Sequence, residues 1–299
     1  MDSIIFGDNQ FFGINHVSED KAQALAERFK DVRAILDVVD TAYDCGIRAF
    51  MFNTHDRVAE VCDHFRANPQ RYKDIRLYPS MPYAHKYANA VNEKGMIGAL
   101  NEFLFADRTA RQAFSTLVRG GWSVINRDMV SIMGLLVDAE MRMFRGLNIK
   151  AIFLQNIVTD LLLGLEAKDV FRAFAEHVRT TYGVDPAFNT MNMPRLVEFL
   201  DECGISNPIV CSSINKAGYF MSPGAEKYEE TLCSSSFRPI AMSVLASGAI
   251  PAEEAIDYVC GLPNLQGIVF GASSKAHIIE TRELILSRWK EGMLARTGS

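Results

Sequence analysis

Eight short apolar runs that alternate with helical stretches are the feature of this sequence that most constrains its fold. The runs are rich in Ile, Val, Phe and Met, and they occupy residues 3–7, 48–53, 75–80, 150–155, 186–190, 208–212, 239–243 and 267–271. Their apolarity is continuous rather than alternating, as in parallel strands that are covered on both faces. Eight strand–helix units favour a closed barrel over an open doubly wound sheet. We therefore predict a fold of the α/β class, a (β/α)8 TIM barrel formed by residues 1–299 as a single domain.

The connection between the third and fourth strands is far longer than the others. About seventy residues separate these strands, and a connection of that length is not a simple loop. It has a helical pattern of its own that is rich in Met and Phe. We predict a helical insertion over residues 88–148 that covers the barrel mouth, forms a homodimer contact or packs on the side of the barrel. Elsewhere, helical spacing over residues 18–45 and 194–203 ends before Gly46 and Gly204, and glycine is typical just after a helix.

The composition limits the classes of partner. The chain has 299 residues and a net charge of −5, which argues against a surface for nucleic acid or an anionic membrane. No apolar run reaches the ~18 residues of a membrane span, and the N-terminus lacks the basic and apolar regions of a signal peptide. The six cysteines show no CxxC spacing, so we expect reduced, mostly buried thiols in a cytoplasmic protein. The partner that we expect is a small-molecule substrate.

A loop of small residues follows the eighth strand and opens directly onto a helix. It consists of Gly271, Ala272, Ser273 and Ser274. Backbone N–H groups and the positive end of the helix dipole at such a position suit a phosphate, and phosphates often bind after strands 7 and 8 of (β/α)8 barrels. The alternative is that the loop is only a tight turn with a serine N-cap.

Both ends of the sequence resemble the aldo-keto reductase superfamily. The segments "IAMSVLASGAI" and "PNLQGIVFGASSKAHIIETRELI" are similar to the patterns around that family's seventh and eighth strands. The segment "IIFGDNQFFGIN" resembles its opening strand, and "AILDVVDTAYDCGIRAFMFNTHDRVAEVC" resembles its first helix, second strand and following loop. The resemblance implies a barrel that holds NADP(H) through Ser243, Leu245, Gly271, Ala272, Ser273 and Ser274.

The catalytic tetrad of that family (Asp, Tyr, Lys and His) is not matched. The four positions fall, in that order, on Asn53 or Thr54, near Arg57, on Ser80 or Met81, and on Gln155 or Asn156. The letters DTAY at residues 40–43 spell part of the family motif but precede the second strand, so we place them in a helix. Without the Tyr–Lys pair, carbonyl reduction lacks its usual proton donor, and the resemblance therefore implies a rebuilt reacting end.

Candidate catalytic residues follow the predicted strands, where the site of such a barrel lies. His55 with Asp56 suggests a general base beside a carboxylate, whereas Tyr83 or His85 could act as an acid. Lys86 would lower the pKa of a neighbouring phenol or hold an anion. Lys216, after the sixth strand, could form a Schiff base or anchor a phosphate.

The remaining polar residues at the strand ends are mostly amides, which suit hydrogen bonding to a polar ligand. The candidate substrate-binding residues are Asp8, Gln10, His16, Asn53, Gln155, Asn156, Asn189 and Asn215. His16, His55 and His85 could in principle bind zinc. Because amides are weak ligands for transition metals, we expect no metal site.

Three functions are compatible with these patterns. The first is an NADP(H)-dependent oxidoreductase that acts on a small polar metabolite, with His55 or His85 replacing the missing Tyr. The second is a cofactor-independent lyase, aldolase or isomerase that binds a phosphorylated substrate at the same loop. The third is a non-catalytic barrel that binds a small molecule.

Overall fold

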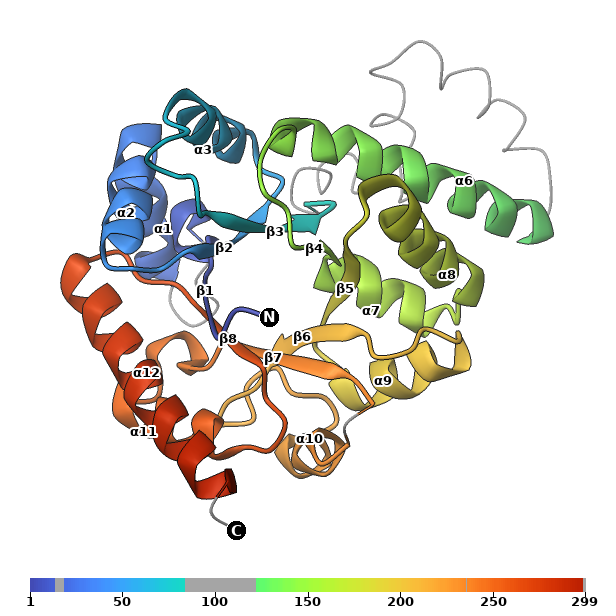
Figure 1. The fold of residues 1–299 in the computed structure, drawn as a ribbon. Coiled ribbons are helices and arrows are strands. Elements are labelled where there is room, and N and C mark those ends of the chain that lie inside the picture. The colour runs from blue at the N-terminus through green and yellow to red at the C-terminus, as the bar shows by residue number, and fades with distance from the viewer. Residues whose placement is uncertain (14–18, 84–121, 235, 298–299) are drawn as a thin grey trace.

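Eight parallel strands form a closed barrel with helices around it (Figure 1). The computed structural model describes residues 1–13, 19–83, 122–234 and 236–297. The strands are β1 (Ile4–Phe6), β2 (Ala49–Asn53), β3 (Arg76–Met81), β4 (Ala151–Leu154), β5 (Asp185–Thr190), β6 (Ile209–Ser213), β7 (Arg238–Met242) and β8 (Gly267–Phe270). Each strand pairs with the next in the sequence, and β8 pairs with β1 to close the ring. The predicted fold class is confirmed, with each strand within one or two residues of its predicted bounds.

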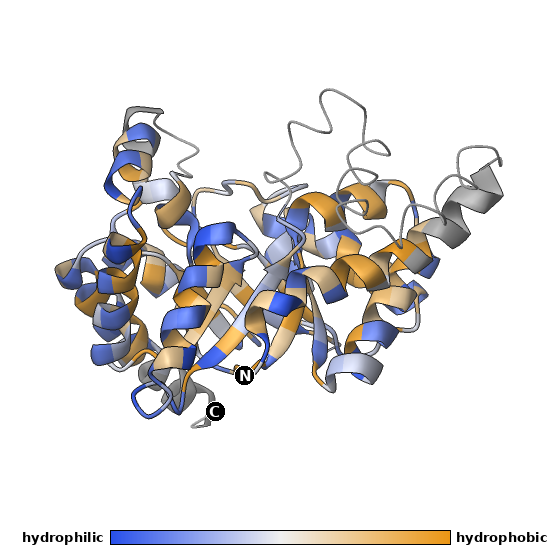
Figure 2. Cartoon of the chain, turned by 90° about the horizontal axis from the view of Figure 1, so that it is seen from above, coloured by the Kyte–Doolittle hydropathy of each residue, from blue (hydrophilic) through white to orange (hydrophobic). Residues whose placement is uncertain are grey.

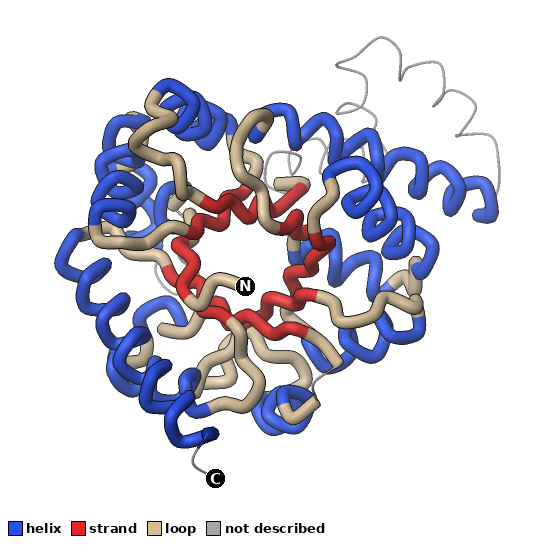
Figure 3. The backbone as a smooth tube through the Cα atoms, viewed as in Figure 1, coloured by secondary structure: helices blue, strands red, loops and turns tan. Residues whose placement is uncertain are grey.

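The helices form an outer ring around the strands (Figure 3). They are α1 (Glu19–Arg28), α2 (Val32–Asp44), α3 (Asp56–Ala67), α6 (Trp122–Met141), α7 (Asn156–Gly164), α8 (Lys168–His177), α9 (Met193–Glu202), α10 (Ala225–Leu232), α11 (Ala252–Gly261) and α12 (Lys275–Thr297). The described ranges also contain the short helical segments η1 (Asn9–Phe12), η3 (Arg142–Phe144), η4 (Val178–Tyr182) and η5 (Ala246–Gly248). Figure 2 shows hydrophilic and hydrophobic stripes along these helices, as expected for amphipathic elements.

The strands are apolar throughout because both of their faces are buried. Alternate side chains point into the barrel, where they form one cluster: Ile5, Ala49, Met51, Tyr78, Ala151, Phe153, Ala187, Ile209, Cys211, Ile240 and Val269. The intervening side chains, such as Phe6, Phe50 and Phe52, belong to a second core that includes buried residues of the helices. This two-sided burial explains the continuous rather than alternating apolarity of the strands.

The helical stretch predicted over residues 18–45 is divided into α1 and α2. Phe29 is fully buried at the break, and the Asp31 carboxylate accepts a hydrogen bond of 2.9 Å from the Arg33 amide to start α2. The predicted ends are confirmed. Gly46 and Gly204 have φ values of 92° and 71°, and each follows a helix closed by the paired hydrogen bonds of a Schellman motif. The DTAY letters lie within α2, as predicted.

The long connection between β3 and β4 is described only in its second part. There, α6 packs against α8 on the side of the barrel (Figure 1). Residues 84–121 lie outside the described residues, so the predicted insertion over residues 88–148 and its homodimer contact stay predictions. No helix in the described ranges is long and apolar enough to cross a membrane. All six cysteines are free; Cys62, Cys203 and Cys211 are buried, and Cys233 is exposed.

Candidate active site at the barrel mouth

The inward-facing positions of five strands change from apolar to polar at the C-terminal end of the barrel. Counting two residues on from the interior cluster gives Asn53, Ser80, Gln155, Asn189 and Ser213, all of which are buried. Because side chains on one face of a strand recur every second residue, these five groups project into the mouth. The same alternation identifies Ser80 and Ser213 as groups at the mouth once the interior residues are known.

Asp8, just after β1, lies at the centre of a hydrogen-bond network in this mouth. Its Oδ2 accepts a hydrogen bond of 2.6 Å from the Asn53 amide, and its Oδ1 accepts one of 2.8 Å from Asn53 Nδ2. Gln155 Nε2 donates to Asn53 Oδ1 at 3.0 Å. The network therefore joins residues from β1, β2 and β4, and it occupies two of the positions to which the family tetrad maps.

Burial raises the pKa of the Asp8 carboxyl from its ordinary value of 3.8 to about 7. The side chain is only 3% exposed, and removal from water disfavours the charged form of a carboxylic acid. The hydrogen bonds from Asn53 favour the charged form but offset only part of this effect. Near neutral pH the carboxyl is therefore present in both protonation states.

Asn189 contributes a buried acceptor to the mouth. Its Nδ2 donates a hydrogen bond of 2.9 Å to Ser80 Oγ, whereas its buried Oδ1 has no hydrogen-bond partner among the residues that the structure describes. A buried acceptor left unsatisfied costs free energy. A bound molecule that supplies an O–H or N–H donor would satisfy this oxygen, so Asn189 marks a position for a ligand.

An aromatic wall borders the network. The His55 ring stacks on Phe12 with a centroid separation of 4.2 Å, and its centroid lies 5.6 Å from that of Tyr83. Burial first, and then the charge of Asp8, raise the pKa of the Tyr83 phenol to about 12. Tyr83 is therefore protonated at neutral pH, and the effect that we proposed for Lys86 on a neighbouring phenol concerns a residue outside the described ranges.

The structure gives His55 and Asp56 positions at the start of α3. The Nδ1 atom of His55 accepts a hydrogen bond of 3.1 Å from the Arg57 amide and so caps the helix. The neutral ring therefore carries its proton on Nε2. Asp56 is the first residue of α3, where a negative charge stabilises the helix dipole. Both residues thus have local roles that account for their position.

Several other candidates lie away from the network or outside the described residues. Lys216 is exposed and forms an ion pair of 2.6 Å with Glu254, so it lacks the burial that activates a Schiff-base lysine. Asn215 is buried but exchanges two hydrogen bonds with the backbone of Tyr219. Asn156 begins α7 and is half-buried. The structure does not describe His16, His85 or Lys86. Among the described residues there is no cluster of His, Cys, Asp or Glu that could hold a metal ion.

The end of the Gln10 side chain lies against Gly271. A Cβ atom added there would be 2.1 Å from Gln10 Oε1, and Gln10 Nε2 donates a hydrogen bond of 2.8 Å to the Gly7 carbonyl. Gln10 therefore links the end of β1 to the loop after β8. This contact gives Gln10 a structural role in addition to the substrate-binding role that we proposed.

The loop after β8 combines a capped helix with a guanidinium group. Ser274 Oγ accepts a hydrogen bond of 3.3 Å from the His277 amide, which makes it the N-cap of α12. Arg28, in the last turn of α1, donates to the Ser273 carbonyl. A cation beside a helix N-terminus fits a phosphate group. Arg28 could not be identified from the sequence because it lies 245 residues from Ser273 and no local pattern links the two residues.

The loop after β7 has an unusual backbone. Ser243, Ala246 and Ser247 have φ values of 55°, 45° and 57°, which is the left-handed region that residues with a Cβ atom rarely occupy. Leu245 precedes η5 and is half-buried. Strained backbone of this kind is frequent in loops that clamp a ligand. Of the two loops that the resemblance assigns to NADP(H), the one after β7 is a strained turn and the one after β8 is a helix N-terminus that suits a phosphate.

Comparisons with known proteins support the fold. No protein-family model and no curated protein matches the sequence. A putative aldo-keto reductase from Pseudomonas aeruginosa has a TM-score of 0.61 at 10% identity, over 96% of this chain and 90% of that chain. A putative 2,5-diketo-D-gluconic acid reductase B has a TM-score of 0.56 at 13% identity, over 96% of this chain and 86% of that chain. An aldo-keto reductase from a Medee basin deep-sea metagenome library has a TM-score of 0.54 at 11% identity, over 91% of this chain and 89% of that chain.

These likenesses and the closed eight-stranded topology agree with the resemblance found in the sequence. Three of the mapped tetrad positions carry Asn53, Ser80 and Gln155, and all three lie buried at the mouth. The chain therefore has the barrel fold of the aldo-keto reductases, with a network around Asp8 at its mouth.

Proposed function

We propose that this chain is an oxidoreductase-type barrel enzyme that binds a small polar metabolite at its mouth and uses Asp8 to exchange a proton with it. The observation that carries the proposal is the buried Asp8 carboxyl with a pKa of about 7. A general acid–base catalyst works best when its pKa is close to the working pH. Asp8 would thus replace the proton donor that is lost with the Tyr–Lys pair.

NADP(H) is the cofactor that we propose for the loops after β7 and β8. Arg28 and the start of α12 support a phosphate at Ser273 and Ser274, and the strained turn at Ser243 supports a ligand beside β7. When bound, NADP(H) would supply or accept a hydride. Gly271, Ala272 and Leu245 would complete the two loops.

The residues of the chain would divide the remaining tasks at the mouth. Asn53, held by Gln155, fixes both oxygens of Asp8. In the direction of reduction, protonated Asp8 donates its proton to the carbonyl oxygen; in the direction of oxidation, the carboxylate accepts the proton of the alcohol. Asn189 Oδ1 accepts a hydrogen bond from the bound molecule, and the ring of Phe12 with its stacked His55 excludes water from one side.

A second candidate is a lyase or isomerase that uses no nicotinamide. The same Asp8 carboxylate could remove a proton next to a carbonyl group, and Arg28 with Ser273 and Ser274 could hold the phosphate of the substrate. The ion pair of Lys216 with Glu254 disfavours an aldolase that works through a Schiff base at that lysine.

Titration of the protein with NADPH, followed by nicotinamide fluorescence and thermal shift, tests the proposal. We expect micromolar binding that is about tenfold or more weaker in Arg28→Gln. Arg33→Gln is the matched control because Arg33 is an exposed arginine on α2, and it should bind like the original protein. Absence of NADPH binding together with stabilisation by sugar phosphates would favour the second candidate. Affinity for small molecules without turnover of any carbonyl, alcohol or phosphate ester would favour a non-catalytic barrel.

A further inference from the structure

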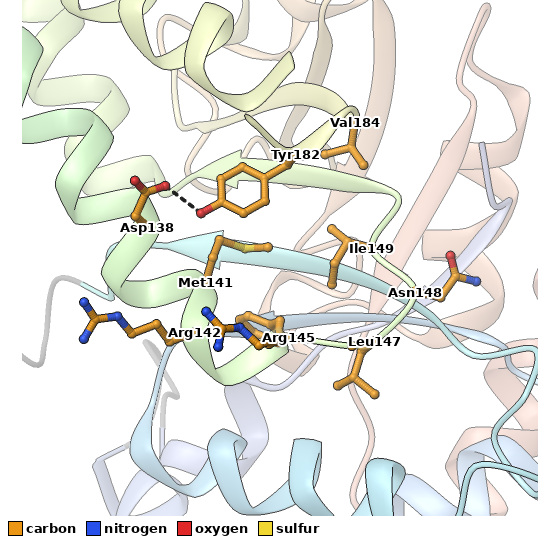
Figure 4. Close-up of a pocket in the computed structure, with 11 residues that line it drawn as sticks. Asp138, Met141, Arg142, Arg145, Leu147, Asn148, Ile149, Tyr182 and Val184 are labelled. Atoms are coloured by element: carbon orange, nitrogen blue, oxygen red, sulfur yellow. Dashed lines mark hydrogen bonds between the residues drawn. The ribbon is translucent and has the colours of Figure 1, made fainter. Parts of the chain in front are cut away.

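A pocket lies at the end of the barrel opposite the polar mouth. Its volume is about 470 Å³, and its lining residues come from the end of α6, from η3 and from the segments that precede β4 and β5 (Figure 4). Ile149 and Val184, for example, lie just before these two strands, whereas Asp8 and Asn53 lie at the C-terminal strand ends. A pocket of this size is in the range that binds small organic molecules. Nothing in the proposed reaction uses it.

One wall of this pocket is apolar. Met141, Leu147, Ile149 and Val184 contribute to the lining, and Figure 4 draws Met141 and Ile149 in the middle of the view. Apart from Met141, these side chains are only partly buried. An apolar group that covered them would gain free energy through removal of their surface from water.

The other wall carries positive charge. Arg142 and Arg145 both line the pocket and are exposed, and in Figure 4 both lie on the side of Met141 that is opposite the Asp138–Tyr182 pair. Within the described residues the Arg145 side chain forms no ion pair. Its backbone carbonyl accepts a hydrogen bond of 3.2 Å from Arg66, and its backbone amide donates one of 3.3 Å to the Arg142 carbonyl. A guanidinium group is suited to planar, two-point recognition of a carboxylate.

The acidic residue of the pocket is already bonded to its neighbours. Asp138 Oδ1 accepts a hydrogen bond of 2.7 Å from the Tyr182 hydroxyl and lies 2.7 Å from His177 Nε2. These contacts direct the carboxylate towards α8 and η4. The positive charge that we assign to ligand binding is therefore that of Arg145.

We infer that this pocket binds a small organic monoanion, with its carboxylate on Arg145 and its apolar body against Met141 and Ile149. The site is independent of the mouth, since it lies at the other end of the strands. It is a binding site, and no reaction is assigned to it.

The test uses 2-naphthoate as the probe and the full chain, with isothermal titration calorimetry as the readout. We expect binding that is about tenfold or more weaker in Arg145→Gln, and equally reduced when the neutral 2-naphthylmethanol replaces the acid. Leu147→Trp, which fills the pocket, should also weaken binding. Arg33→Gln, an exposed arginine on another helix, should bind like the original protein.

The position of the ligand is read from the methyl resonances of ¹³C-labelled methionine. The signal of Met141, assigned by its absence in Met141→Leu, should shift on addition of 2-naphthoate. Equal binding of the acid and the alcohol, equal binding by Arg145→Gln and the original protein, or an unmoved Met141 signal would each overturn the inference. Circular dichroism of each variant confirms that a loss of binding does not come from loss of the fold.

Discussion

Replacing Asp8 with Asn tests the central feature of the mouth, the buried carboxyl. In the native chain, raising the pKa from 3.8 to about 7 corresponds to about 4 kcal/mol of folding free energy when the group is fully charged, since each tenfold change in proton affinity is worth about 1.4 kcal/mol. The side chain of Asn has the shape of the protonated acid and no charge. Asp8→Asn should therefore remove this pH-dependent cost without opening a cavity. Its NH2 group cannot accept one of the two hydrogen bonds that Asn53 donates to Asp8, and that loss is the same at every pH.

The cost depends on pH in a defined direction. Because the pKa of Asp8 is higher in the folded chain than in the unfolded chain, the folded chain binds more protons between pH 3.8 and about 7, and its stability falls as the pH rises through this window. Below the window both chains are protonated and the cost vanishes, whereas above it the cost is constant. The contribution is about 1.7 kcal/mol at about pH 5 and about 4 kcal/mol at about pH 8.5.

Urea unfolding of both proteins at these two pH values measures the effect. All other groups titrate alike in both proteins, so their contributions cancel in the difference between the two free energies of unfolding. The stability of Asp8→Asn relative to the native chain should increase by about 2.5 kcal/mol between the lower and the higher pH. A difference that stays constant within about 0.5 kcal/mol would refute the raised pKa, and with it the reason for assigning the proton exchange to Asp8.

Three further predictions concern individual positions. Gly271→Ala should lower the free energy of unfolding by about 1–2 kcal/mol because its Cβ displaces Gln10. In a double-mutant cycle, the same substitution made in Gln10→Ala should have almost no effect on the free energy of unfolding. Lys216→Met should leave turnover unchanged and change stability by less than about 1 kcal/mol, because its ion pair with Glu254 is exposed; a large loss of kcat would restore a catalytic lysine. His55→Ser keeps an N-cap on α3, so it should retain kcat within about tenfold, whereas Asp8→Asn should lose about 10²–10⁴-fold; the reverse order in steady-state assays would assign the acid–base role to His55.

The sequence determined the fold through local patterns. Each run of apolar residues is buried on both faces in the barrel, and the order of the strands follows the order of the runs. Gly46 and Gly204 predicted two helix ends because a left-handed residue after a helix favours glycine. The division of residues 18–45 into two helices was missed, since Phe29 and Asp31 fit a continuous amphipathic pattern as well as a break.

The site depended on contacts between distant parts of the chain. Asp8 could be named from the sequence as a polar residue after a strand, but its pKa follows from burial beside Asn53, which lies 45 positions further on. Lys216 and Asn215 were both named from the sequence as polar residues after the sixth strand. In the structure Lys216 forms an exposed ion pair, whereas Asn215 holds its own loop through the Tyr219 backbone. Arg28 is a candidate phosphate-binding residue only because the fold places α1 beside Ser273. Apolar periodicity and turn residues act locally and can be read from sequence, whereas desolvation and charge pairing depend on which groups tertiary packing brings together.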